Sequence, residues 1–195
     1  MTVSADKKQQ FEAFYMIAHP LSVNVIPQTS TEMPDETEFE ALMPHAFRLA
    51  GQFASADTTL LRSLRQLGDQ AEILVEYLQA QAQKMDWMLS YILEQQDDPA
   101  FRHVTQKFGG GGMVVKHPTA MDEGAIAQLK LFVPTEHSAI FCFGEVIACE
   151  AVEDEYHIAF LFSRIRESDQ ELLVRASLHL QTQQLRARNK TSTSP

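Results

Sequence analysis

The chain has 195 residues, 45% of them hydrophobic, which is enough for one domain with a sizeable core plus an extension, or for two small domains. Its formal net charge is -10, which argues against nonspecific nucleic-acid binding, because such binding needs basic surface to replace counterions. No apolar run approaches the roughly 20 residues of a membrane span. No apolar signal core follows Lys7 and Lys8 near the N-terminus. We therefore expect a cytoplasmic protein that neither binds nucleic acid nor inserts into membranes.

The first part of the chain predicts a tail, one strand and a loop. Residues 1–10 are polar and are expected to fray. Phe14 to Ile26 is an extended apolar segment, in which Pro20 favours an edge or a bend. Residues 27–40 are acidic and rich in turn-forming residues, which indicates a loop. A short helix is expected at residues 41–53.

A heptad repeat from Leu60 to Gln95 is the strongest pattern in the chain. Its positions follow one another at alternating spacings of four and three, with no proline inside. An apolar period of 3.5 residues held this long predicts a left-handed seam with another helix. We place the helix at residues 57–96, with Asp57 as its N-cap. The predicted oligomerisation residues are Leu60, Leu64, Leu67, Ala71, Leu74, Leu78, Gln81, Met85, Met88 and Ile92.

The flanks of this repeat are unusual for a two-stranded coiled coil. Its e positions are mostly apolar, and an a/d/e stripe is wider than a two-helix seam requires. The pattern indicates three or more helices meeting, or two helices plus a domain face, and a tetramer is favoured over a dimer. The alternative is a long amphipathic helix lying on its own domain. Gln81 is a polar d residue, expected to fix the register or the oligomer number. The e positions are Leu61, Gly68, Val75, Ala82 and Leu89.

After Pro99 the apolar period changes from helical to two, which indicates strands. A capping box at residues 168–171 is expected to open a terminal helix from Leu172 to about Arg188. Short strands separated by turn signals indicate a sandwich or a barrel. The predicted strands are residues 103–108, 113–116, 126–133, 139–152 and 156–162.

The first strand precedes the heptad helix and the others follow it, so we read the helical part as an insertion in a β-domain. Residues 1–40 hold the tail, the first strand and the acidic loop. Residues 41–98 form the helical insertion. Residues 99–195 supply the rest of the β-domain and the C-terminal helix.

Five pieces after the heptad helix follow one another in a distinctive order. They are Gly111–Val115, Gly124–Pro134, Gly144-Glu145-Val146, Tyr156–Phe162 and the acidic-capped helix Glu167–Arg188. This order resembles a PilZ domain, the bacterial receptor module for cyclic di-GMP. The resemblance implies an α+β fold, a PilZ-like antiparallel β-barrel with an inserted long coiled-coil helix and a C-terminal helix. The chain is similar to the subset of PilZ proteins that carry a long heptad helix and form tetramers.

The ligand residues of that family do not carry over. The family signature has two arginines four apart, which grip phosphates with bidentate donors, and then Asp/Asn-x-Ser-x-x-Gly. Here no two arginines are four apart, and Lys107 stands where Asp or Asn should be. Gly109 replaces the serine, and only Gly112 matches. The ammonium group of Lys107 cannot accept a hydrogen bond from guanine.

Other patterns give no enzyme site. The four glycines at residues 109–112 lead into a strand instead of the Gly-Lys-Ser/Thr and helix of a phosphate loop, so a tight turn with close backbone approach is expected. The histidines form no metal-spaced pair. Cys142 and Cys149 read as plain core thiols. We therefore expect no enzyme, no metal and no cofactor.

The expected function is that of a non-enzymatic oligomeric adaptor in a bacterial cyclic di-GMP pathway. It would dock an unidentified protein partner and bind the nucleotide weakly or not at all. The alternative is a cyclic di-GMP receptor that uses non-standard residues. For that alternative the candidate nucleotide-binding residues are Arg102, Lys107 and Gly112, helped by Arg186 and Arg188.

Overall fold

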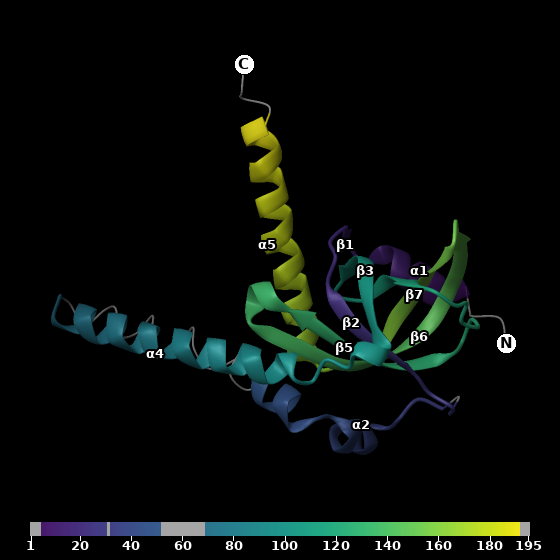
Figure 1. The fold of residues 1–195 in the computed structure, drawn as a ribbon, viewed down its shortest axis with the longest axis horizontal. Helices are drawn as coiled ribbons and strands as arrows, with labels where there is room; N and C mark the ends of the chain where they lie inside the picture. The colour runs from purple at the N-terminus through teal and green to yellow at the C-terminus, as the bar shows by residue number, and fades with distance from the viewer. Residues whose placement is uncertain (1–4, 31, 52–68, 192–195) are drawn as a thin grey trace.

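A computed structural model describes residues 5–30, 32–51 and 69–191 of the chain (Figure 1). Within those ranges, no helix combines the length and the hydropathy that crossing a bilayer requires. Besides a helical segment at residues 45–51, the elements are α1 (Ala5–Ala13), β1 (Met16–Ile17), β2 (Ser22–Pro27), α2 (Glu36–Leu42), α4 (Asp69–Glu94), η2 (Pro99–Phe101), β3 (Arg102–Gly109), β4 (Gly112–His117), β5 (Ile126–Val133), η3 (Pro134–Glu136), β6 (Ser138–Val152), β7 (Glu155–Arg164) and α5 (Glu167–Thr191).

The strands form one antiparallel sheet that closes into a barrel. Their order is β1-β3-β2-β5-β6-β7-β4, and β3, beside the short β1, also pairs with β4, which closes the barrel. The short β1 extends β3 at its glycine end, where Met16 pairs with Gly109. β6 pairs with β7 through a register shift between Phe143 and Gly144. The predicted α+β fold, with a barrel, a long helix and a C-terminal helix, is confirmed.

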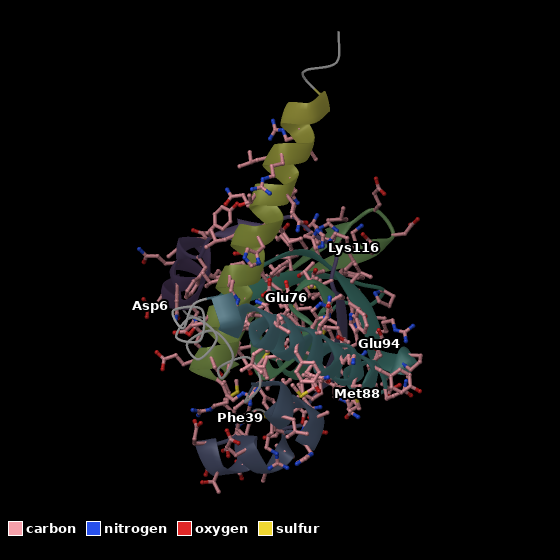
Figure 2. All side chains as sticks on the ribbon, turned by 90° about the vertical axis from the view of Figure 1, so that its left-hand side faces the viewer. Asp6, Phe39, Glu76, Met88, Glu94 and Lys116 are labelled. Carbon is pink, nitrogen blue, oxygen red and sulfur yellow. The ribbon has the colours of Figure 1, made fainter. Side chains whose placement is uncertain are left out.

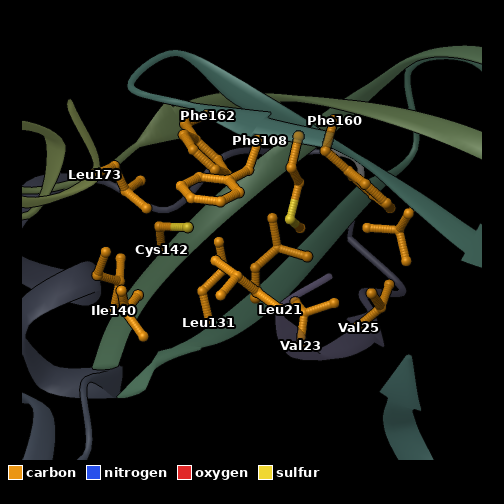
Figure 3. Packing of buried hydrophobic residues seen from close by; sticks show 14 of the residues in the cluster. Leu21, Val23, Val25, Phe108, Leu131, Ile140, Cys142, Phe160, Phe162 and Leu173 are labelled. Atoms are coloured by element: carbon orange, nitrogen blue, oxygen red, sulfur yellow. The ribbon is translucent and has the colours of Figure 1, made fainter. Parts of the chain in front are cut away.

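Alternate residues of the strands fill the barrel (Figure 3). Leu131, Cys142 and Phe160 point inward from neighbouring strands and are fully buried. The first half of α5 packs Leu172 and Leu173 against the same core. Each large apolar side chain removed from water contributes about 1.5–3 kcal/mol, so this cluster holds the barrel and α5 together.

A second cluster lies on the outer face of the barrel and fixes the end of α4. The ring of Phe141 packs against Phe39 of α2, with ring centroids 5.8 Å apart, and against Phe47, at 6.0 Å. Leu89 and Leu93 of α4 are buried in the same cluster. Phe141 can face outward while Cys142 faces the core because successive strand residues point to opposite sides.

The connection between β5 and β6 contacts both long helices. The Glu136 carboxylate accepts hydrogen bonds from Nε of Arg175 at 3.2 Å and from Nδ1 of His179 at 2.8 Å, both on α5. Next to it, the His137 ring lies 3.2 Å from the Ser90 hydroxyl of α4. One short segment therefore contacts both helices.

The strands lie close to their predicted ranges, but two helices begin in unexpected places. Residues 5–13 form α1 instead of a frayed tail, because Phe11 is buried against the sheet. α2 begins at Glu36, inside the predicted loop, where Asp35 and Glu38 form a capping box. Both helices depend on contacts that hydrophobic periodicity does not report.

α5 begins at the residue that the family resemblance implied, and before the Leu172 start that the capping box predicted. It starts at Glu167, so the predicted capping box at residues 168–171 lies inside its first turns. Arg166 instead binds the Asp169 carboxylate there, at 2.8 and 3.0 Å. For the heptad helix, the predicted N-cap Asp57 and the predicted interface residues Leu60, Leu64 and Leu67 lie outside the described residues.

Candidate functional site

α4 carries an exposed apolar stripe that coincides with the predicted a and d positions. Its side chains are between 36% and 66% exposed. Figure 2, viewed from the side toward which α4 projects, labels Met88 on this helix. Gln81, the polar member of the repeat, is partly buried. We define the α4 stripe as Leu74, Leu78, Met85, Met88 and Ile92.

The apolar e positions are used differently from the a and d positions. Val75 and Leu89 are buried, and Leu89 packs on its own barrel. The g positions Tyr77 and Tyr91 are exposed. The sequence allowed either further helices or a domain face to cover the apolar e positions. For Leu89, the covering surface is a face of its own barrel. The surface left open for other helices includes the apolar a and d positions and the g positions Tyr77 and Tyr91.

The structure separates Arg102 from Lys107 and Gly112, which lie near each other across β3 and β4. Arg102 stands at the start of β3, where its Nε donates to the Asp97 carboxylate at 2.7 Å. Lys107 lies five residues further along the same strand, about 16 Å away at the usual rise of 3.3 Å per residue. Arg186 lies in the last turns of α5. A single small ligand bound at Lys107 would not reach the Arg102 end of the strand.

Lys107 lines a pocket of about 350 Å³ against the sheet. The buried apolar residues that line it are Phe11, Val114, Ile147 and Ala159. Its polar lining is of mixed charge, because two lysines stand beside two glutamates. These polar residues are Lys8, Lys107, Glu12, Glu150, Gln106 and His157.

The cations of α1 already have carboxylate partners. Lys7 lies 2.6 Å from a carboxylate oxygen of Glu145, and Lys8 lies 3.2 Å from Glu123. These lysines precede the first strand, as the arginine pair of the family signature does. In this fold they hold α1 against the sheet.

The glycine run is a packing surface. A methyl group added at Gly110 would lie 2.7 Å from Val174 of α5, and one at Gly111 would overlap the Phe14 ring. Gly112 is buried and lies against Phe11 of α1 and the Phe160 backbone. The predicted close backbone approach is confirmed, and it explains why side chains are excluded here.

Two histidines that are far apart in sequence meet across β3 and β4. The ring centroids of His103 and His117 are 4.2 Å apart. Burial lowers the pKa of His103, and the nearby charge of His117 lowers it further. Within the described ranges, no three His, Cys, Asp or Glu side chains are grouped to hold a metal ion. The two histidines meet because of the register in which β3 pairs with β4. Their spacing in the sequence does not predict this contact.

The predicted core role of Cys142 is consistent with its surroundings. Its thiol is fully buried, and this burial, helped by the charge of Asp169, raises its pKa well above the usual value. A thiol held in its neutral form is a poor nucleophile. Cys149 is partly buried against the same core.

The barrel, the long helix and the C-terminal helix define a known class of bacterial domain. The sequence model of the PilZ domain matches residues 79–179, just over half of the chain. The chain belongs to the PilZ family, as the order of its elements predicted. The match reaches back into α4, beyond the region of the sequence resemblance.

A solved structure from Xanthomonas campestris shows the same fold. A pathogenic protein from Xanthomonas campestris, described as a new tetrameric PilZ domain self-assembled via an unusual helical bundle, superposes with a TM-score of 0.56 and 16% identity, over 93% of this chain and 97% of that one. An inhibitor of motility from Bacillus subtilis gives a TM-score of 0.40 and 18% identity, over 42% of each chain. No curated protein sequence matches the chain.

Proposed function

We propose that the protein is a non-enzymatic adaptor of a bacterial cyclic di-GMP pathway that assembles with its own copies through the α4 stripe. The tetramer favoured by the heptad pattern is part of this proposal. The observation that carries it is the exposure of the apolar a and d side chains on α4. Membership of the PilZ family supports the pathway and the non-enzymatic role.

Among the residues that the structure describes, α4 has little of the packing that a helix of its length requires. Its 26 residues extend for about 39 Å. Among residues 73–94, only Val75, Leu89 and Leu93 are buried. Isolated helices are marginal in water, and most helical stability in proteins comes from packing an apolar face. Association of the stripe with other copies would supply that packing, and the Xanthomonas protein is described as assembling through a helical bundle.

The remaining parts of the proposal follow from the sequence. The division into residues 1–40, 41–98 and 99–195 separates an assembly helix from the barrel that would dock an unidentified protein partner. The cytoplasmic location expected from the sequence belongs to the same proposal.

Light scattering on the full chain tests the assembly. We expect an oligomer at micromolar concentration. At high salt, Leu74→Asp should give monomers, because a charge in the seam would be buried without a partner. Gln83→Asp is the matched control, since Gln83 is exposed on the same helix outside the stripe. A monomeric parent protein, or a Leu74→Asp variant that stays assembled at high salt, would contradict the proposal.

We further propose that cyclic di-GMP binds weakly or not at all. Charged hydrogen bonds contribute about 1.5–3 kcal/mol each, and each 1.4 kcal/mol is about tenfold in affinity. Losing the two arginines and the acidic or amide residue would take a micromolar site past millimolar. The pairing of Lys7 and Lys8 with carboxylates supports this expectation.

The second candidate function is a nucleotide receptor that uses the Lys107 pocket. The presence of Lys8 and Lys107 in one pocket favours it. Titration with labelled cyclic di-GMP separates the two functions. A micromolar Kd that Lys107→Ala weakens, and that the distant Arg102→Ala leaves unchanged, would establish the receptor and refute weak binding.

A further inference from the structure

A groove beside α2 combines an apolar lining with an acidic rim. Its volume is about 450 Å³. Ile126 and Phe143 are buried, and Leu42 is 52% exposed. Glu32 and Glu38 line the same groove. We name this surface the α2 groove.

The chain around the α2 groove is strongly acidic. Residues 32–40 contain five carboxylates and no basic residue. Arg164 lies 3.3 Å from Glu36, which offsets one of these charges. Glu38 also closes the capping box of α2, and it remains exposed. A partner for this groove should therefore bring apolar and basic groups together.

The end of α5 has that chemistry. Leu180 is the last buried residue among residues 167–188 of α5, and residues 182–188 are all exposed. Leu178 and Leu185 are 52% and 50% exposed, and residues seven apart share one helix face. Residues 181–191 contain three basic residues and no acidic residue. We name this segment the α5 end.

One chain cannot bring the two surfaces together. In Figure 1, α2 lies at the bottom of the molecule and the C-terminal end of α5 at the top, with the barrel between them. The complementary surfaces of one protein can then meet only between two copies. A helix laid in an apolar groove is a common mode of recognition, and an acidic rim would steer a basic helix into place.

We propose that the α5 end of one copy docks in the α2 groove of a second copy. This contact is separate from the α4 stripe, and it is head-to-tail, because it joins two different surfaces. Such contacts form rings when the rotation closes and chains when it does not. The protein would therefore have two ways to associate, one apolar and one sensitive to salt.

A charge-swap experiment tests the contact in full-length protein that carries Leu74→Asp, which removes the α4 contribution. The groove variant is Glu32→Arg with Glu38→Arg, and the tail variant is Arg186→Glu with Arg188→Glu. We expect the parent to associate reversibly at low salt. Each variant alone should associate at least about tenfold more weakly, which corresponds to 1.4 kcal/mol. An equimolar mixture should recover the parent behaviour, because opposite charges then face each other.

Sedimentation velocity measures these differences. Thr37→Arg is the matched control, because Thr37 is exposed on α2 and does not line the groove. The proposal is overturned if the parent does not associate, if either variant associates like the parent, or if the mixture does not recover. It is also overturned if Leu42→Cys and Leu185→Cys copies form no mixed disulfide. None of these outcomes affects the α4 assembly, which is measured in protein with Leu74 intact.

Discussion

The ring of Phe14 lies where a side chain on Gly111 would have to stand. The contact joins the residue that follows α1 to the turn between β3 and β4. Gly109 makes a similar approach to the Tyr15 backbone. The segment after α1 therefore packs directly against the backbone of Gly109 and Gly111, where any side chain would clash with it.

We predict that Gly111→Ala destabilises the protein. The added methyl group must displace Phe14, and overpacking of this kind costs about 1–3 kcal/mol. Thermal or urea unfolding measures the loss. Combining Gly111→Ala with Phe14→Ala should cost less than the sum of the two single changes, because the clash is relieved. Additive effects would show that the two residues do not interact.

Arg166→Gln should be strongly destabilising. Arg166 binds Asp169, which is 2% exposed, and also donates to the Phe47 carbonyl at 3.0 Å. Removing one partner of a buried ion pair costs about 3–5 kcal/mol. The control is Arg164→Gln, which breaks the more exposed pair with Glu36 and should cost at most about 1 kcal/mol. If the two variants lost equal free energy of unfolding in urea, the larger contribution assigned to the Arg166–Asp169 pair would be wrong.

Stability should fall as the pH drops below about 6.5, the ordinary pKa of histidine. The pKa of His103 is lowered in the folded protein, so the unfolded chain binds its proton first. Protons taken up by the unfolded state favour unfolding. His103→Gln should flatten the dependence of the melting temperature on pH between 8 and 5. An unchanged slope would exclude this histidine as the cause.

Gln81→Leu should raise the melting temperature of the assembly and mix its oligomeric states. A polar residue at a core position of a coiled coil specifies the register at a cost in stability. Scanning calorimetry and light scattering on the variant measure both effects. A lower melting temperature would show that Gln81 makes a favourable contact of its own.

The sequence predicted the strands well because their alternation and their ends are local signals. β5, for example, ends at Val133 because Pro134 follows it. α1 was missed because its sequence carries no apolar stripe, and the helix depends on the packing of Phe11. The capping box expected at residues 168–171 does not open α5, because the first turn is held by Arg166, whose partners come partly from another segment.

The candidate site was less predictable than the fold. A heptad pattern identifies which side chains share a helix face, but it does not say what covers that face. Leu89 belongs to the repeat and faces its own barrel, whereas Met88 beside it is exposed. Arg102 and Lys107 are near in sequence, yet an extended strand separates them. The meeting of His103 and His117 depends on the pairing of two strands.

Glu136 and His137 give the assembly a geometric constraint. Glu136 binds α5, and His137, its neighbour, lies against Ser90 of α4. Two helices that contact adjacent residues of one short connection cannot change their mutual angle without breaking these bonds. If copies associate through α4, every α5 in the oligomer would point in a direction set by this connection. A partner that tilts α5 would then alter the free energy of assembly, and assembly would alter that partner's affinity by the same factor.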